Sequence, residues 1–166
     1  SPAAAFDPTR MVPLGYDDTD YGTPAREGTA VSLTIDGREV TVPAGTSVMR
    51  AAIEAGVKVP KLCATDSLEA WGSCRLCLVE IQGQPGFHAS CARPVEQGMV
   101  VITSSEAVRE LRRTVLEMLV SEHNMSCSTC DRDGDCLLQD YAYEYRVAEK
   151  RFPSILIPPD TSTYAT

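Results

Sequence analysis

Seven cysteines and one histidine stand at spacings that suit metal or cluster binding. The first set has gaps of 10, 2 and 13 residues between its members, and the second has gaps of 3, 2 and 5. The first set is Cys63, Cys74, Cys77 and Cys91, and the second is His123, Cys127, Cys130 and Cys136. Two cysteines separated by two residues can direct both sulfurs to one centre, because the turn between them aims its amides at the sulfurs. A thiolate bound to iron or zinc is deprotonated, so its burial does not leave an uncompensated charge.

The spacing favours iron–sulfur chemistry for the first set and leaves zinc open for the second. Structural zinc usually uses two short cysteine or histidine pairs, whereas the first set has one short pair and two distant cysteines. That layout is closer to a [2Fe–2S] ferredoxin, although the plant-type gap of 4 is replaced here by 10. Three cysteines with one histidine form a known zinc site as well as a cluster site. Inert buried cysteine is typical of a lone thiol but not of sets with this spacing.

Composition indicates a globular protein with one domain or two small ones. The chain has 166 residues, of which 43% are apolar and 23% charged, and its formal charge is −8. This acidic balance argues against a nucleic-acid partner. No signal peptide and no apolar run of about 18 residues is found in the sequence, so we expect a cytoplasmic location and no membrane-spanning segment. Thiols stay reduced in the cytoplasm, so the seven cysteines need an explanation other than disulfides.

The region before Thr103 predicts a small sheet with one packed helix. Alternating β-formers at 31–35 and 39–42 flank Asp36-Gly37, which predicts a hairpin. A helix should follow, capped by Thr46 or Ser47 and ended by Gly56. Further strands are expected at 78–81 and 99–102, and His88 should lie in a surface turn between them. We therefore predict an α+β fold, with a ferredoxin-like β-grasp domain followed by a small helical cluster-binding domain.

The region after Thr103 predicts two helices around the second cysteine set. The first is long and amphipathic, with Thr103 and Glu106 as a capping box. Its expected apolar side comprises Val108, Leu111, Val115, Met118 and Leu119. Its expected solvent-exposed side comprises Arg109, Arg112 and Arg113. The segment 137–152 looks helical again. The predicted organisation is an arm at 1–28, a ferredoxin-like domain at 29–102, a helical domain at 103–152 and an extended tail at 153–166.

The stretches "LCATDSLEAWGSCRLCLVEI" and "HNMSCSTCDRDGDCLLQDYAYEYRV" resemble one family closely. The family is the N-terminal module of the large iron–sulfur subunit of respiratory complex I. It includes the diaphorase part of NAD-linked hydrogenases and the large subunit of NAD-dependent formate dehydrogenases. The resemblance implies a [2Fe–2S] cluster on the first set and a His-ligated [4Fe–4S] cluster on the second. It also implies that the segment transfers electrons and has no catalytic residue of its own.

Within this family the segments "VPAGTSVMRAA", "FDPTR" and "GTPARE" look most like formate dehydrogenase. That resemblance implies a relay between a formate-oxidising site and an NAD-reducing flavin subunit, with further iron–sulfur subunits as partners. The whole complex would then hold further clusters, molybdopterin with molybdenum or tungsten, FMN and NAD. The alternatives are the equivalent module of an NAD-linked hydrogenase or complex I, and a structural zinc module without redox activity. Formate dehydrogenase subunits continue into further domains, so the chain is expected to be a fragment or a shortened relative.

Overall fold

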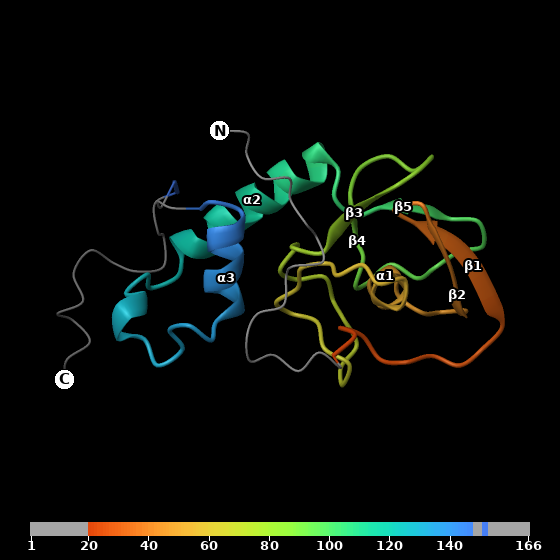
Figure 1. Cartoon of the computed structure of the whole chain (residues 1–166), viewed down its shortest axis with the longest axis horizontal. Helices are drawn as coiled ribbons and strands as arrows, with labels where there is room; N and C mark the ends of the chain where they lie inside the picture. Colours follow the sequence, from red (N-terminus) through yellow and green to blue (C-terminus); the bar gives the residue numbers. More distant parts are fainter. Residues whose placement is uncertain (1–19, 148–150, 153–166) are drawn as a thin grey trace.

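The computed structural model describes residues 20–147 and 151–152. Predictions for the first part of the arm, including "FDPTR", and for the extended tail at 153–166 lie outside these residues. The described chain contains a five-stranded sheet with one short helix beside it, and a pair of helices at the other end of the molecule (Figure 1). None of the described helices has the length and apolar character that crossing a membrane requires.

The sheet is mixed and has the strand order β2-β1-β5-β3-β4. Its strands are β1 (Ala30–Ile35), β2 (Arg38–Pro43), β3 (Leu78–Ile81), β4 (His88–Ala89) and β5 (Val100–Ile102). Strands β1 and β5 are parallel, and the other neighbouring pairs are antiparallel. A mixed sheet with few helices confirms the α+β class, while the finer β-grasp description stays a prediction.

The first hairpin forms where the sequence predicts it. Ile35 pairs with Arg38, and the two residues between them both have left-handed backbones, with φ of 47° at Asp36 and 78° at Gly37. Asp and Gly tolerate positive φ better than other residues, and this twist matches that of the flanking strands. The short strand β4 was not predicted. His88 therefore belongs to the sheet and is half-buried, and its assignment to a surface turn is wrong.

Helix α1 (Val48–Glu54) packs its apolar side against the sheet. The side chain of Ser47 caps it by accepting a hydrogen bond from the amide of Arg50 at 3.1 Å. Gly56 follows the helix with a φ of 76°, as expected for a glycine that ends a helix. The sequence prediction of this helix is confirmed.

The second half contains α2 (Glu106–Ser121), the short 3₁₀ turn η2 (Cys127–Thr129) and α3 (Leu137–Glu144). Ser105 caps α2 through the amide of Val108, so the predicted capping box is wrong. Thr103 is used elsewhere, since its amide donates to the Asp36 carboxylate at 2.8 Å. This bond joins the end of β5 to the first hairpin.

The buried side of α2 is rotated from the predicted one. Met118, expected to be apolar core, is 48% exposed, whereas Leu116 is fully buried. Arg112, predicted to lie on the solvent-exposed side, is 3% exposed. The sequence pattern missed this because a single buried arginine looks like any other charged residue on a helix.

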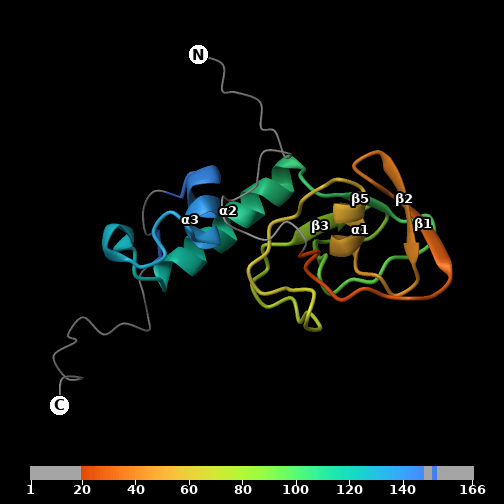
Figure 2. The ribbon, with the colours of Figure 1, turned by 60° about the horizontal axis from the view of Figure 1, so that its bottom comes forward.

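Leu76 joins the two halves of the molecule. It lies between Cys74 and Cys77, and it is fully buried in a core formed with α2 and α3. Cys77, the next residue in this loop, belongs instead to the core under the sheet. The loop that carries the first cysteines lies between the sheet with α1 and the helix pair in both views (Figure 2). The predicted boundaries at 28, 102 and 152 remain predictions.

Candidate iron–sulfur sites

The first cysteine set lies in two close pairs. The backbone amide of Cys74 donates to the sulfur of Cys63 at 3.3 Å, and the sulfurs of Cys77 and Cys91 lie 3.4 Å apart. Cys63 is exposed and Cys74 is half-buried, whereas Cys77 and Cys91 are buried. The site is therefore deep on one side and reaches the surface on the other.

The close thiols of Cys77 and Cys91 do not readily ionise together without a positively charged group beside them. The close Cys91 thiol lowers the pKa of Cys77 to about 6, against the opposing effect of burial. The pKa of Cys91 is raised, first by its contact with Cys77 and by burial, and then by the negative charges of Cys77, Cys63 and Cys74. Burial also raises the pKa of Cys74. Iron would remove this conflict, because a coordinating thiol is deprotonated by the metal. The donor set thus fits a four-thiolate cluster.

Glycine and left-handed backbone shape the loop between these cysteines. Gly72 has a φ of 66°, and a Cβ there would lie 3.2 Å from the Cβ of Ala89 in β4. Arg75 has a φ of 59° and its side chain is exposed. Left-handed conformations turn the chain sharply, so Cys74 and Cys77 can face one centre while Leu76 points into the helical core.

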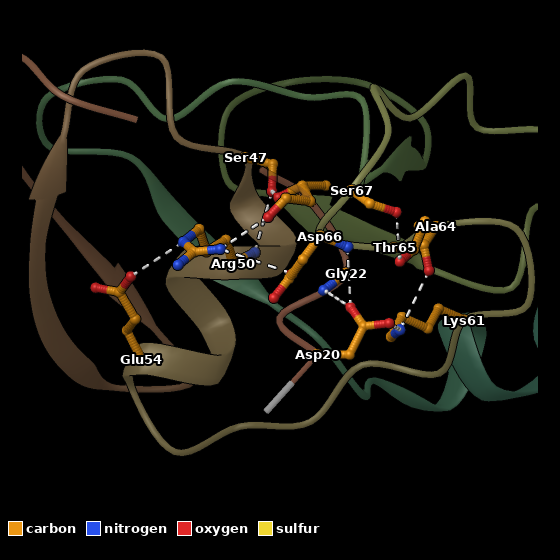
Figure 3. A network of polar contacts seen from close by, with 11 residues as sticks. Asp20, Gly22, Ser47, Arg50, Glu54, Lys61, Ala64, Thr65, Asp66 and Ser67 are labelled. Atoms are coloured by element: carbon orange, nitrogen blue, oxygen red, sulfur yellow. Dashed lines mark hydrogen bonds and ion pairs between the residues drawn. The ribbon is translucent and has the colours of Figure 1, made fainter. Parts of the chain in front are cut away.

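Asp20 holds the loop that presents Cys63 (Figure 3). One carboxylate oxygen accepts hydrogen bonds from the amides of Gly22 at 2.7 Å and Asp66 at 3.1 Å. The other lies 3.0 Å from the ammonium of Lys61, which in turn donates to the carbonyl of Ala64 at 3.1 Å. These contacts fix the chain on both sides of Cys63. Burial acts to raise the pKa of Asp20, but the hydrogen bonds and Lys61 together outweigh it and lower that pKa.

The segment around Asp20 is itself held against α1. Arg50 donates to the carbonyl of Thr23 at 2.8 Å, and its guanidinium stacks over the ring of Tyr21 at 4.6 Å from the centroid. A Cβ at Gly22 would lie 2.5 Å from the sulfur of Met49, so only glycine permits this close approach. The described end of the predicted arm is therefore packed on the domain.

The second set lines one pocket at the end of the helix pair. All four predicted ligands contribute to its wall, together with apolar side chains from α2 and α3. The predicted ligands are His123, Cys127, Cys130 and Cys136, and the apolar residues are Val120, Met125, Leu138 and Ala142. The fit to a cluster rests on this shared cavity and on its mixed sulfur and imidazole lining.

Local hydrogen bonds shape the loop of the second set. The turn η2 closes through the amide of Cys130, which donates to the carbonyl of Cys127 at 2.9 Å. The amide of Arg132 approaches the sulfur of Cys130 at 3.5 Å. Gln139 in α3 then pins the loop, donating to Asp133 at 2.7 Å and accepting from the amide of Gly134 at 3.0 Å. Amide donors of this kind stabilise negative charge on ligand sulfur.

Neither set of ligands converges tightly on a single point. Within the part of the chain that the structure describes, no group of three or more His, Cys, Asp or Glu side chains is arranged to hold one metal ion.

Two family models match the chain. Residues 28–106 match a 2Fe-2S iron-sulfur cluster binding domain, and residues 112–151 match the NADH-ubiquinone oxidoreductase-G iron-sulfur binding region. The chain contains two iron–sulfur binding domains. Their order and positions agree with the two sets of ligands that the sequence suggests. The assignment of individual ligands remains a prediction.

Similar proteins occur in oxidoreductase complexes that act on NADH. The chain is 43% identical over 126 residues to the NADH-ubiquinone oxidoreductase 78 kDa subunit of Candida albicans, covering 76% of this chain and 18% of that protein. It is 39% identical over 135 residues to the corresponding 78 kDa subunit of Neurospora crassa, covering 81% of this chain and 18% of that protein. The chain thus spans about a fifth of the length of these relatives.

One solved structure is similar to this chain in both fold and amino-acid sequence. The NAD⁺-reducing [NiFe]-hydrogenase in its H₂-reduced state matches with a TM-score of 0.70 and 38% identity, over 80% of this chain and 56% of that chain. The chain is therefore an iron–sulfur module of the NADH-ubiquinone oxidoreductase-G and NAD⁺-reducing hydrogenase type. The resemblance to the wider family is confirmed, and the narrower resemblance to formate dehydrogenase is not shown.

Several residues that shape these sites carry no signal in the sequence. Asp20 and Lys61 look like ordinary surface charges, and Tyr141 looks like one aromatic residue among several. In the structure Asp20 and Lys61 hold the Cys63 loop, and the hydroxyl of Tyr141 accepts a hydrogen bond from the amide of Lys61. Such partners meet through long-range contacts that periodicity and spacing do not record.

Proposed function

We propose that this chain is an electron-transfer module with one [2Fe–2S] and one His-ligated [4Fe–4S] cluster. Each cluster, when bound, accepts and releases single electrons. The first is held by Cys63, Cys74, Cys77 and Cys91, and the second by His123, Cys127, Cys130 and Cys136. The observation that carries the proposal is the pairing of Cys63 with Cys74 and of Cys77 with Cys91 within a matched cluster-binding domain.

The protein's own contribution is to hold, shield and orient these ligands. Amides of Cys74 and Arg132 approach ligand sulfurs, which stabilises negative charge on them. Burial of Cys77 and Cys91 keeps water from one side of the first site. Cys63 lies on the exposed side, so we expect electrons to enter or leave the first cluster on that side.

The complex in which the module works is a finer part of the proposal. The named relatives are subunits of NADH-ubiquinone oxidoreductase and an NAD⁺-reducing hydrogenase, so they support the alternative of the sequence analysis better than its main hypothesis. On that basis we propose partners of the flavin- and NAD-binding type and further iron–sulfur subunits. The formate dehydrogenase hypothesis, with its molybdenum or tungsten cofactor, rests only on the short segments quoted from the sequence.

Metal analysis and low-temperature EPR of the chain purified without oxygen test the cluster proposal. About six irons per chain and two distinct reduced signals are expected, two irons from one cluster and four from the other. Cys77→Ser should remove only the binuclear signal, and Cys136→Ser only the other. A colourless protein with stoichiometric zinc would instead support the structural zinc module.

The native complex decides between the possible electron donors. NADH, hydrogen and formate can each be added to the oxidised complex while the visible absorbance of the clusters is followed. Reduction by NADH or hydrogen supports the proposed type of complex. Rapid reduction by formate alone would restore the formate dehydrogenase hypothesis.

A further inference from the structure

A buried cation lies where the two domains meet. Arg112 projects from α2 with only 3% of its surface exposed. Its guanidinium donates to the carbonyl of Leu78 at 2.7 Å and contacts the hydroxyl of Tyr145 at 3.5 Å. Leu78 follows Cys77 directly in the chain, so α2 reaches the first cluster site through this hydrogen bond.

In the part of the chain that the structure describes, no carboxylate neutralises this guanidinium by direct contact. Among the described residues, no ion pair involves Arg112, and its Nε atom has no hydrogen-bond partner. The buried carboxylate on the same helix, Glu117, pairs instead with Arg113 at 3.3 Å and Arg151 at 2.9 Å. A charge buried without a partner is costly, which suggests that a negative group elsewhere compensates for it.

Glu144 in α3 is a nearby carboxyl group that could compensate the positive charge of Arg112. It does so only in part. Burial raises its pKa to about 7, although Arg109 and Arg112 act to lower it. Near neutral pH this group therefore carries its negative charge only part of the time, and it shares that charge between two arginines.

The first cysteine site supplies a more negative group. The guanidinium of Arg112 donates to the carbonyl of Leu78, the residue directly after Cys77, so its positive charge lies beside this site. In a [2Fe–2S] cluster, four thiolates and two sulfides together outweigh the charge of the irons. One-electron reduction makes the cluster more negative still. A fixed buried cation therefore favours the reduced form, because its field is weakly screened by solvent.

From this arrangement we infer that Arg112 tunes the binuclear cluster, raising its reduction potential from a position in the neighbouring helical domain. The inference rests on the proposed function, since it requires the cluster on the first cysteine set. Arg112 acts on the electron equilibrium through its charge, from its contact with the carbonyl of Leu78. The position of Arg112 also makes the reduction potential of the binuclear cluster depend on the packing of α2 against β3.

EPR-monitored redox titration of the binuclear signal tests this role. Arg112→Gln should lower the midpoint potential, whereas Arg112→Lys, which keeps the charge, should shift it much less. Arg113→Gln is the matched control, because Arg113 is the next residue on the helix but its side chain is 54% exposed. An unchanged or higher potential in Arg112→Gln, or equal shifts in the Gln and Lys variants, would overturn the inference.

A titratable substitution covers the case in which Arg112→Gln does not fold. Arg112→His carries its charge at low pH and loses it at high pH. Each measurement is repeated in a Glu144→Gln background, which removes the neighbouring group that also titrates near neutrality. The difference in potential between Arg112→His and its parent should grow as the pH rises, and a constant difference would overturn the inference. A wild-type protein without any binuclear signal would defeat the proposed function itself, which separates the two failures.

Discussion

The hydroxyl of Tyr141 accepts a hydrogen bond from the backbone amide of Lys61 at 3.3 Å. Tyr141 lies in α3, five residues after the proposed ligand Cys136, and Lys61 lies two residues before the proposed ligand Cys63. Burial raises the pKa of Tyr141 to about 12, so the hydroxyl keeps its proton at neutral pH. Helix α3 therefore links the second proposed cluster site to the segment beside Cys63 through this hydrogen bond.

Removal of this hydroxyl should destabilise the fold modestly. Tyr141→Phe leaves the Lys61 amide without its acceptor at a half-buried position, which should cost about 1–2 kcal/mol. The matched control is Tyr143→Phe, because Tyr143 is 74% exposed and lies on the same helix. Urea unfolding without oxygen measures both variants. Equal midpoints for the two variants would contradict a structural role for the Tyr141 hydroxyl.

Loss of the Asp20 charge should weaken retention of the first cluster. Asp20→Asn preserves size but removes the ion pair with Lys61 and weakens the hydrogen bonds that fix the loop around Cys63. We expect an iron chelator to bleach the binuclear cluster several-fold faster in this variant, while the other cluster is lost at the wild-type rate. Glu69→Gln serves as the control, because the pair of Glu69 with Arg26 is largely exposed. The same bleaching rate in Asp20→Asn and the wild type would show that these contacts are dispensable.

Glu144 should make stability fall as the pH rises through neutrality. Burial raises the pKa of its carboxyl to about 7, against the lowering effect of Arg109 and Arg112. The folded state therefore holds the proton more tightly than the unfolded state. Its contribution is complete below the ordinary value of 4.5 and is lost as the pH rises through about 7.

The Glu144→Gln variant isolates this effect. Urea midpoints of the variant and the wild type, measured between pH 5 and pH 8, should differ increasingly as the wild type loses stability. The variant cannot ionise at this position, so its own profile should be flatter. Parallel profiles would mean that Glu144 does not titrate in this range.

His123 should raise the potential of the second cluster. A neutral imidazole in place of a thiolate makes a cluster less negative, which eases its reduction, as in Rieske centres. His123→Cys should therefore lower the midpoint potential of the [4Fe–4S] signal in a redox titration. A higher or unchanged value would argue that His123 is not a ligand of this cluster.

The sequence by itself predicted the type of chemistry and much of the local structure. Short-range rules sufficed for the Asp36-Gly37 hairpin, the Ser47 cap and the strand at 78–81, because each depends on neighbouring residues. The division of the cysteines into two sets could also be predicted, because the spacing of ligands depends on how a turn positions their sulfur atoms. The wider family followed from these same residues.

Only the tertiary structure decided how the two sites are joined. Leu76 enters the helical core while Cys77 enters the sheet core, and Arg112 is buried at the junction instead of on the surface. Ser105 caps α2 in place of the predicted Thr103, because Thr103 bonds to Asp36, which is 67 residues away in the chain. Each outcome depends on contacts between distant segments. Periodicity reports only which residues could face a core, and packing selects which of them do.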